Sequence, residues 1–316
     1  MSVLIVKNVS HGFGSRVILE DVSFRLLKGE HVALIGANGE GKSTFMNIIT
    51  GNLMPDQGEV TWSSHVTVGY LDQHASLKDG TTIRDTLRGA FDEMYSMEQE
   101  MLKLYEDMAE ASPEEMDKMM EEAAEIQTIL DDGGFYIIDS KIEEVAGGLG
   151  LREIGLDSLV NELSGGQRTK VLLTKLLLKN PTILLLDEPT NYLDFEHIEW
   201  LKKYLNNYEN AFILISHDVP FINDVTNIIY HVEDGSLTRY VGNYDEFERL
   251  YDLKKRQHEQ AYEKQQKEVE KLIQVEPEII ALDATDRIRP GKETLEHLFT
   301  NIRKQYTKQL FMADCS

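Results

Sequence analysis

The sequence is poor in cysteine and has no long apolar run. Its one cysteine, Cys315, is next to the last residue, so no disulfide framework can form within the chain. No apolar run approaches the roughly 20 residues that a membrane-spanning helix needs, and the first residues lack the layout of a signal peptide. These absences exclude a disulfide-rich secreted domain, predict no membrane span, and favour a cytoplasmic protein.

Basic residues are also scarce, and the imbalance is local. The chain has 32 Lys and Arg against 55 Asp and Glu, for a net charge of −23. Between Asp92 and Glu144 there are 18 acidic residues and three basic ones. Such a segment repels nucleic acid phosphates, although most of its carboxylates fit a solvated helical face. We therefore expect no DNA partner, and any contact with RNA must come from another part of the chain.

A glycine-rich loop follows directly after the apolar run Val32–Ile35. The loop and the residue after it are Gly36, Ala37, Asn38, Gly39, Glu40, Gly41, Lys42, Ser43 and Thr44. They match the phosphate-loop pattern G-x-x-x-x-G-K-S between a strand and a helix. Backbone N–H groups of such a loop point at phosphate oxygens, Lys42 supplies positive charge, and the Ser43 hydroxyl is a ligand for Mg²⁺. The sequence predicts a nucleoside triphosphate site here.

The pattern around this loop is first β-rich and then helical. Residues 3–9, 22–26 and 31–35 are expected strands, and 58–62 with 66–71 are expected to form a hairpin. From residue 81 to about 148 apolar residues recur at helical spacing, with a bend expected near Ser112, which would cap the second helix.

A second α/β stretch contains an acidic pair. The apolar run Ile183–Leu186 ends in Asp187 and Glu188, and Ala211–Ile215 is a further buried strand. If the acidic strand lies beside the phosphate-loop strand, Asp187 would hold Mg²⁺ and Glu188 would act as general base toward the attacking water.

A third motif is Leu163 followed by Ser164, Gly165, Gly166 and Gln167. Ser164 can cap the helix that begins there, and the glycines leave N–H groups open to an anion. Together with the phosphate loop and the acidic strand, this motif resembles the LSGGQ signature of ATP-binding cassette (ABC) ATPases. The resemblance implies an α/β P-loop nucleotide-binding domain, ATP and Mg²⁺ as ligands, and ATP hydrolysis.

The same resemblance assigns roles to four more residues. Gln73 matches the Q-loop glutamine, which senses Mg²⁺ and the attacking water, and Asp194 matches the D-loop aspartate. His217 matches the switch histidine, which contacts the γ-phosphate. Phe13 matches the aromatic residue that stacks on adenine, with a role as a core aromatic as the alternative. The implied catalytic set is then Glu188, His217 and Gln73, and the implied Mg²⁺ ligands are Ser43, Gln73 and Asp187.

In ABC enzymes ATP lies between the phosphate loop of one cassette and the signature of another. The resemblance therefore implies that Ser164–Gln167 act on ATP held by a partner cassette. Hydrolysis would need that second cassette, either by dimerisation or from a missing half.

Details of these motifs resemble the ABC-F type. Asp187–Asp194 reads DEPTNYLD, and Tyr240–Phe247 resembles the start of the ABC-F interdomain linker. The helical segment before Leu163 lies where these proteins have their arm. The resemblance is to bacterial translation-associated ATPases of the energy-dependent translational throttle kind. It implies a ribosomal partner, both rRNA and ribosomal protein, in translation control or antibiotic protection.

We expect an ABC cassette over residues 1–242 with the arm at about 88–145, the start of a helical linker over 243–272, and an unassigned tail over 273–316. Two-cassette chains are usual for ABC-F proteins, whereas this sequence has one. A truncated or frameshifted product is the preferred explanation for the single cassette, and a naturally short protein that forms a homodimer is the other. Two alternatives stay open: the ATPase subunit of a membrane transporter, and a truncated ATP-binding module with little turnover.

Overall fold

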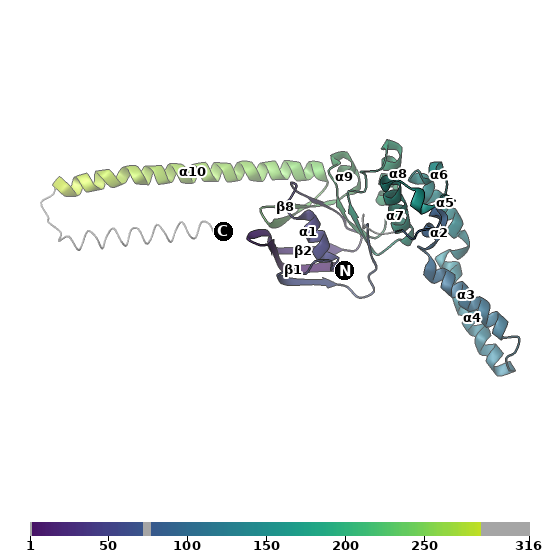
Figure 1. The fold of residues 1–316 in the computed structure, drawn as a ribbon. Helices are drawn as coiled ribbons and strands as arrows, with labels where there is room; N and C mark the ends of the chain where they lie inside the picture. The colour runs from purple at the N-terminus through teal and green to yellow at the C-terminus, as the bar shows by residue number, and fades with distance from the viewer. Residues whose placement is uncertain (1, 72–76, 286–316) are drawn as a thin grey trace. The chain divides into compact units, whose positions relative to one another are not determined.

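The structure is a computed structural model that describes residues 2–71 and 77–285, with side chains up to residue 267. The chain divides into two compact units, Met1–Arg249 and Leu250–Ser316, which are described separately (Figure 1). The strands are β1 (Ser2–Phe13), β2 (Arg16–Leu27), β3 (His31–Ile35), β4 (Gln57–Trp62), β5 (Val68–Tyr70), β6 (Ile183–Asp187), β7 (Ala211–Ile215), β8 (Ile228–Glu233) and β9 (Ser236–Val241). The helices are α1 (Lys42–Ile49), α2 (Ile83–Arg88), α3 (Asp92–Asp107), α4 (Pro113–Gly133), η1 (Phe135–Ile137), α5 (Ile138–Gly148), α6 (Leu151–Ile154), η2 (Val160–Glu162), α7 (Gly165–Lys179), α8 (Phe195–Asn206), α9 (Val219–Val225) and α10 (Tyr244–Thr285).

The larger sheet has six strands in the order β5-β6-β7-β3-β8-β9. Its first five strands pair in parallel, and β9 is antiparallel to β8. Every residue of β7 is buried, as are all but one residue each of β3 and β6, which explains why these strands read as continuous apolar runs. The α/β fold predicted from the sequence is confirmed.

One expected neighbour relation is wrong. The acidic strand β6 does not lie beside β3, because β7 is hydrogen-bonded between them. A strand–helix–strand connection can place its second strand on either side of the first, so the sequence order does not determine the order within the sheet.

The expected hairpin between residues 58–62 and 66–71 is also wrong. Strand β4 pairs with β1 in a separate three-stranded antiparallel sheet of order β2-β1-β4, whereas β5 pairs with β6. Both strands have β-forming residues, but each pairs with a partner that is distant in the sequence, and local turn signals carry no information about that choice.

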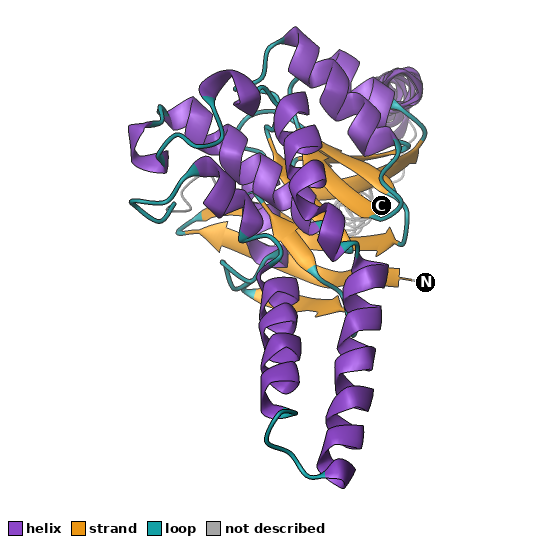
Figure 2. Ribbon diagram, turned by 90° about the vertical axis from the view of Figure 1, so that its right-hand side faces the viewer, coloured by secondary structure: helices purple, strands orange, loops and turns teal. Residues whose placement is uncertain are grey.

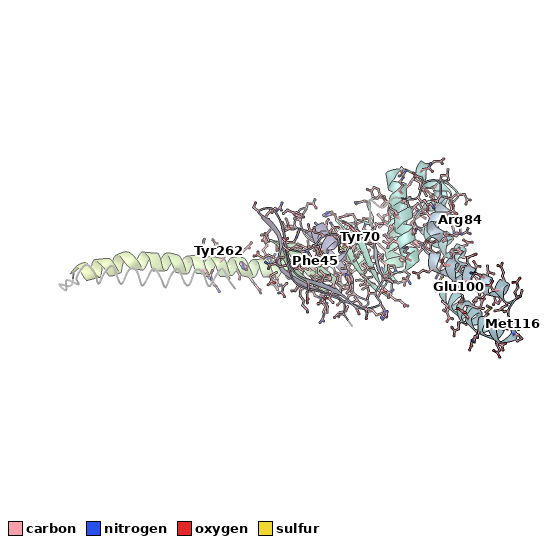
Figure 3. All side chains as sticks on the ribbon, turned by 60° about the horizontal axis from the view of Figure 1, so that its bottom comes forward. Phe45, Tyr70, Arg84, Glu100, Met116 and Tyr262 are labelled. Atoms are coloured by element: carbon pink, nitrogen blue, oxygen red, sulfur yellow. The ribbon has the colours of Figure 1, made fainter. Side chains whose placement is uncertain are left out.

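The two sheets share one core with helix α1. Leu4 of β1, Leu26 of β2, Leu34 of β3 and Phe45 of α1 are all fully buried in it. The Phe24 ring meets Phe45 edge-on at 5.3 Å between ring centroids; Figure 3 labels Phe45 within this packed region. The helix that follows the phosphate loop is thus fixed by burial of its apolar face.

Helices α2 to α6 form an insertion between β5 and α7. Figure 2 shows α3 and α4 side by side as an antiparallel pair, with the bend where the sequence predicts it. Ser112 and Glu115 form a capping box, in which the Ser112 N–H and hydroxyl both donate to the Glu115 carboxylate. The buried residues of the pair are Met101, Ala123 and Leu130, so most of its surface faces solvent.

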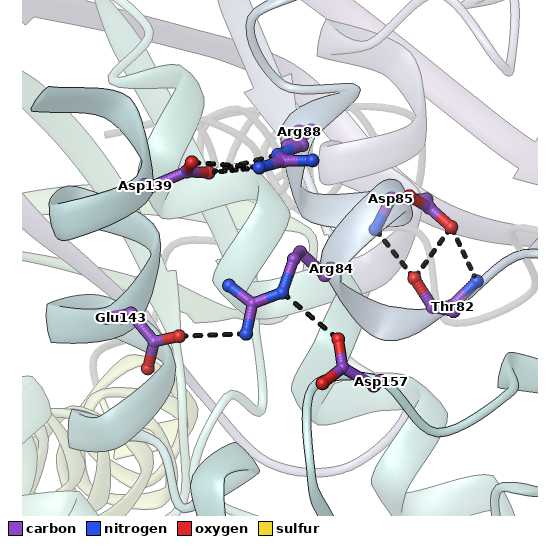
Figure 4. A network of polar contacts seen from close by, with 7 residues as sticks. All are labelled: Thr82, Arg84, Asp85, Arg88, Asp139, Glu143 and Asp157. Carbon is purple, nitrogen blue, oxygen red and sulfur yellow. Dashed lines mark hydrogen bonds and ion pairs between the residues drawn. The ribbon is translucent and has the colours of Figure 1, made fainter. Parts of the chain in front are cut away.

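A network of ion pairs joins the helices within this insertion (Figure 4). Arg84 of α2 pairs with Glu143 of α5 at 3.0 Å and with Asp157 at 3.2 Å. Arg88, also on α2, makes a bidentate contact with Asp139 of α5. Helices α2 and α5 are thereby held together where the α3–α4 pair joins the rest of the insertion.

Helix α10 begins at Tyr244, at the place predicted for the linker, and continues beyond residue 272 to Thr285. Its side chains from Leu253 to Lys267 are exposed. No helix in the described ranges is both long enough and apolar enough to cross a membrane.

Candidate functional site

The phosphate loop connects the central strand β3 to helix α1. Helix α1 begins at Lys42 after Gly41, whose φ of 106° is accessible mainly to glycine. A Cβ on Gly41 would lie 2.6 Å from the Ile18 side chain, and one on Gly36 would lie 2.4 Å from the Val232 carbonyl oxygen. These two glycines are required by backbone geometry and close packing, which supports the predicted loop.

Lys42 lies folded back on this loop. Its Nζ donates to the carbonyl oxygens of Gly36 at 2.8 Å and Ala37 at 2.9 Å. The residue is 8% exposed, and burial lowers the pKa of its ammonium group, while the nearby carboxylates of Glu188 and Asp187 act in the opposite direction. The ammonium group is held by two neutral carbonyls that a phosphate group can replace.

Asp187 and Glu188 lie at the end of β6. Burial is the main cause of the raised pKa of each carboxyl group, and for both the charges of Lys42 and His217 act against it. Glu188 adopts a positive φ of 48°, and its backbone N–H donates to Ile215 of β7 at 2.8 Å. Such a strained backbone conformation is typical of residues held for a function.

His217 follows β7 and faces Glu188. Its Nε2 is 3.5 Å from Glu188 Oε1, and its backbone N–H is 3.4 Å from Glu188 Oε2. The His217 side chain is 60% exposed, whereas that of Glu188 is 17% exposed. The parallel pairing of β7 with β6 explains this arrangement, since the residues that follow neighbouring parallel strands lie close together at one edge of the sheet.

The donors in this region suit Mg²⁺. Ser43 is solvent-exposed, and Asp187 provides a carboxylate whose buried charge a cation would stabilise. Hydroxyl, carboxylate, phosphate and water oxygens are the ligands that this ion prefers. Gln73, the third predicted ligand, lies outside the described residues.

Phe13 is at the end of β1, and its side chain is not part of the core. The residue is 57% exposed, which removes the core-aromatic alternative. Arg16, paired with Phe13 in the β1–β2 ladder, donates from Nη2 to the Gly39 carbonyl at 3.2 Å. Sequence analysis missed Arg16, although its place three residues after Phe13 in a tight turn was a usable signal.

The signature residues begin helix α7, as predicted. Ser164 Oγ accepts from the Gln167 N–H at 3.4 Å, and Gln167 Oε1 accepts from the Ser164 N–H at 2.9 Å. Nothing lies within 4 Å of a Cβ built on Gly165. Among the described residues, no hydrogen bond or ion pair joins Ser164–Gln167 to the phosphate loop of the same chain.

Asp194 is the N-cap of helix α8. Its carboxylate accepts from the His197 N–H at 3.3 Å and contacts His197 Nδ1. The hydrogen bond from His197 is the main cause of the lowered pKa of Asp194. The helix that leaves the predicted D-loop is therefore anchored at its first turn.

A phosphate loop on the central strand of a mainly parallel sheet, with buried carboxylates at the same edge, defines a P-loop nucleoside triphosphatase. The comparisons narrow this class. A family model described as "ABC transporter" matches residues 19–191, more than half of the chain, and a second model with the same description matches residues 230–275. The chain belongs to the ATP-binding cassette (ABC) family, whose domains bind and hydrolyse ATP.

Three similar proteins illustrate this membership. The "Uncharacterized ABC transporter ATP-binding protein YfmM" of Bacillus subtilis is 64% identical over 86% of this chain and 52% of that protein. The "Energy-dependent translational throttle protein EttA" of Mycobacterium tuberculosis is 33% identical over 78% of this chain and 43% of that protein. A structure titled "Structure of ATP binding subunit of ABC transporter" has a TM-score of 0.58 at 22% identity, over 79% of this chain and 94% of that one. The chain spans about half the length of the curated relatives it matches.

The last part of the chain matches a different family. A model described as "Putative N-acetylmannosamine-6-phosphate epimerase" covers residues 255–316, and it overlaps the second ABC model only at residues 255–275. The residues after 275 are thus covered by the epimerase model and by neither ABC model.

Proposed function

We propose that this chain binds ATP at the phosphate loop and hydrolyses it together with a second cassette, as an ABC-F-type ATPase that acts on the ribosome. The observation that carries the ATPase assignment is the grouping of Lys42, Asp187, Glu188 and His217. The charge of Asp187 raises the pKa of Lys42, and the charge of Lys42 lowers the pKa of Asp187. The charge of His217 lowers the pKa of both Asp187 and Glu188.

Lys42 is the first group to respond to nucleotide. Its two hydrogen bonds go to uncharged loop carbonyls, whereas a phosphate oxygen carries a negative charge that pairs with the ammonium group. The exchange places the ammonium group against the β- and γ-phosphates. Phe13, exposed on β1, provides a face for the adenine base, and Arg16 adds positive charge beside Gly39.

Glu188 is suited to remove a proton from water. Burial raises the pKa of its carboxylate above the usual value, which makes it a stronger base. His217, beside that carboxylate, can donate to the carboxylate or to the phosphate that leaves. Bound Mg²⁺, held by Ser43 and Asp187, would neutralise phosphate charge.

The signature belongs to the other half of the reaction. Ser164 and Gln167 cap the start of helix α7, yet no hydrogen bond or ion pair joins them to Lys42 within the part of the chain that the structure describes. The proposal therefore requires that Ser164–Gln167 complete the ATP site of a partner cassette. Mass measurement with and without ATP, using the Glu188→Gln form, tests this: an ATP-dependent dimer is expected, and a monomer under both conditions would contradict it.

Four observations support the ribosome as the target. The chain is similar to the translational throttle protein EttA of M. tuberculosis, and Asp187–Asp194 resembles the form of this motif in ABC-F proteins. The exposed α3–α4 pair forms an arm whose acidic surface suits a basic ribosomal protein. Helix α10 has seven Lys and Arg against five Asp and Glu over residues 249–272, so it is the element suited to rRNA phosphates.

Co-sedimentation with ribosomes tests this part of the proposal. The Glu188→Gln form with ATP is expected to pellet with ribosomes and to be released by salt. Changing Lys254, Lys255 and Arg256 to Glu should weaken that association. Equal pelleting of both forms at all salt concentrations would contradict the role of α10. Absence of pelleting from an active ATPase would favour the transporter alternative, and its absence from an inactive monomer would favour an inert ATP-binding module.

A further inference from the structure

A small polar cluster lies beside the exposed Phe13 ring. His11 is 7% exposed, and its ring meets Phe13 edge-on, with 4.9 Å between ring centroids and an angle of 87°. Within the described ranges, neither ring nitrogen of His11 makes a hydrogen bond. A buried polar group without such a bond costs stability. The buried position of His11 is therefore better explained by its ring contact with Phe13 than by a contribution to core stability.

Asp56 connects this histidine to the backbone that leads into Phe13. Its Oδ2 accepts from the Gly12 N–H at 2.9 Å and lies 3.4 Å from His11 Nδ1. The Asp56 N–H in turn donates to the Ser10 carbonyl at 2.9 Å. The Asp56 carboxylate thus restrains both the Gly12 peptide, which precedes Phe13, and the His11 ring, which packs against the Phe13 ring.

We propose that Asp56 and His11 are positioning residues that hold the Phe13 ring ready for the nucleotide base. This inference rests on the proposed role of Phe13 as the adenine platform. A ring that is 57% exposed has little packing to restrain it, and ordering it on binding costs affinity. The pair removes that cost in advance, so the contribution of the base to affinity depends on Asp56 and His11, while the contribution of the phosphates does not.

The test compares two ligands on the full chain by calorimetry: ATP, and inorganic tripolyphosphate, which has no base. Asp56→Ala should weaken ATP binding about tenfold, within the range of a base–aromatic stack, and leave tripolyphosphate binding within about twofold. His11→Leu should have a similar effect, and the double variant should lose no more than about either single one because the two residues act together. Asp56→Asn should retain most of the ATP affinity, since its carbonyl oxygen can still accept from Gly12.

Glu59→Gln is the matched control. The Glu59 carboxylate is on β4, is 61% exposed like that of Asp56, and pairs with Lys7 at 2.9 Å. Glu59→Gln changes the net charge by the same amount as Asp56→Ala but does not alter the turn that carries Phe13. The affinities for ATP and for tripolyphosphate should therefore both stay at the parent values.

The outcomes separate this inference from the proposed function. If Phe13→Ala leaves the ratio of ATP affinity to tripolyphosphate affinity unchanged, the proposed stacking of adenine on Phe13 is wrong. If Phe13→Ala lowers the ratio but Asp56→Ala and His11→Leu do not, the positioning pair is overturned. Equal weakening of both ligands by Asp56→Ala would overturn it as well, because the carboxylate would then only support the fold.

Discussion

Replacing Glu188 by glutamine is the sharpest test of the catalytic site. The amide has nearly the same shape as the carboxylate, and the Glu188 N–H bond to Ile215 is a backbone contact that the change does not affect. The variant should therefore fold and bind ATP. It lacks a group that can take a proton from water, so ATP should remain bound without being hydrolysed.

The expected size of the effect follows from the chemistry of the site. A positioned general base contributes about 10²- to 10⁴-fold to the rate, equivalent to roughly 3–5 kcal/mol of barrier. The Glu188 side chain is 17% exposed, its carboxylate lies 3.5 Å from His217 Nε2, and burial raises its pKa. All three features favour efficient proton transfer, so a loss near the upper end is expected.

The assay is steady-state phosphate release at saturating ATP, at protein concentrations where the ATP-dependent dimer forms. Glu199→Gln is the control, because Glu199 pairs with Lys202 at the surface and has no part in the site. Its rate should equal that of the parent protein. Turnover by Glu188→Gln at the parent rate would refute the general-base role and place water activation elsewhere.

Thermal stability gives an independent measure of the same residue. Because burial raises the pKa of Glu188 in the folded state, its ionisation destabilises the fold as pH rises above the unfolded value of about 4.3. Glutamine avoids this cost, so the variant should melt no lower than the parent at neutral pH. The difference should shrink as the pH falls to 4 or below, and a lower melting temperature at pH 7 would show that the carboxylate is structurally required.

Three further predictions concern other parts of the chain. Lys42→Ala should abolish ATP binding in calorimetry, because no other loop side chain supplies that charge; parent-like affinity would contradict the phosphate-loop assignment. Arg88→Ala should lower the free energy of unfolding by up to about 1 kcal/mol at neutral pH. Arg88 lowers the pKa of Asp139, so this loss should fade as acid protonates Asp139, and an unchanged loss at low pH would contradict it. Deleting residues 276–316 should leave ATP affinity unchanged, since the ABC models end at residue 275; a clear loss would show that the tail supports the cassette.

The sequence was most informative where local chemistry and pattern agree. The strand before Gly36, the cap formed by Ser164 and the bend at Ser112 each depend on residues within a few positions of one another, and each prediction is confirmed. The pairing of strands that are far apart in the sequence could not be predicted in this way. Strand β7 lies between β6 and β3, and His217, which follows β7, faces Glu188.

The same reasoning explains why the cluster around Phe13 was invisible in the sequence. His11 and Asp56 are 45 positions apart, and neither belongs to a recognisable motif. They meet because β4 pairs with β1 rather than with β5, the pairing that the local turn signals predicted wrongly. The residues that position a predicted site can therefore depend on strand pairing even where the residues that touch the ligand are fixed by a motif.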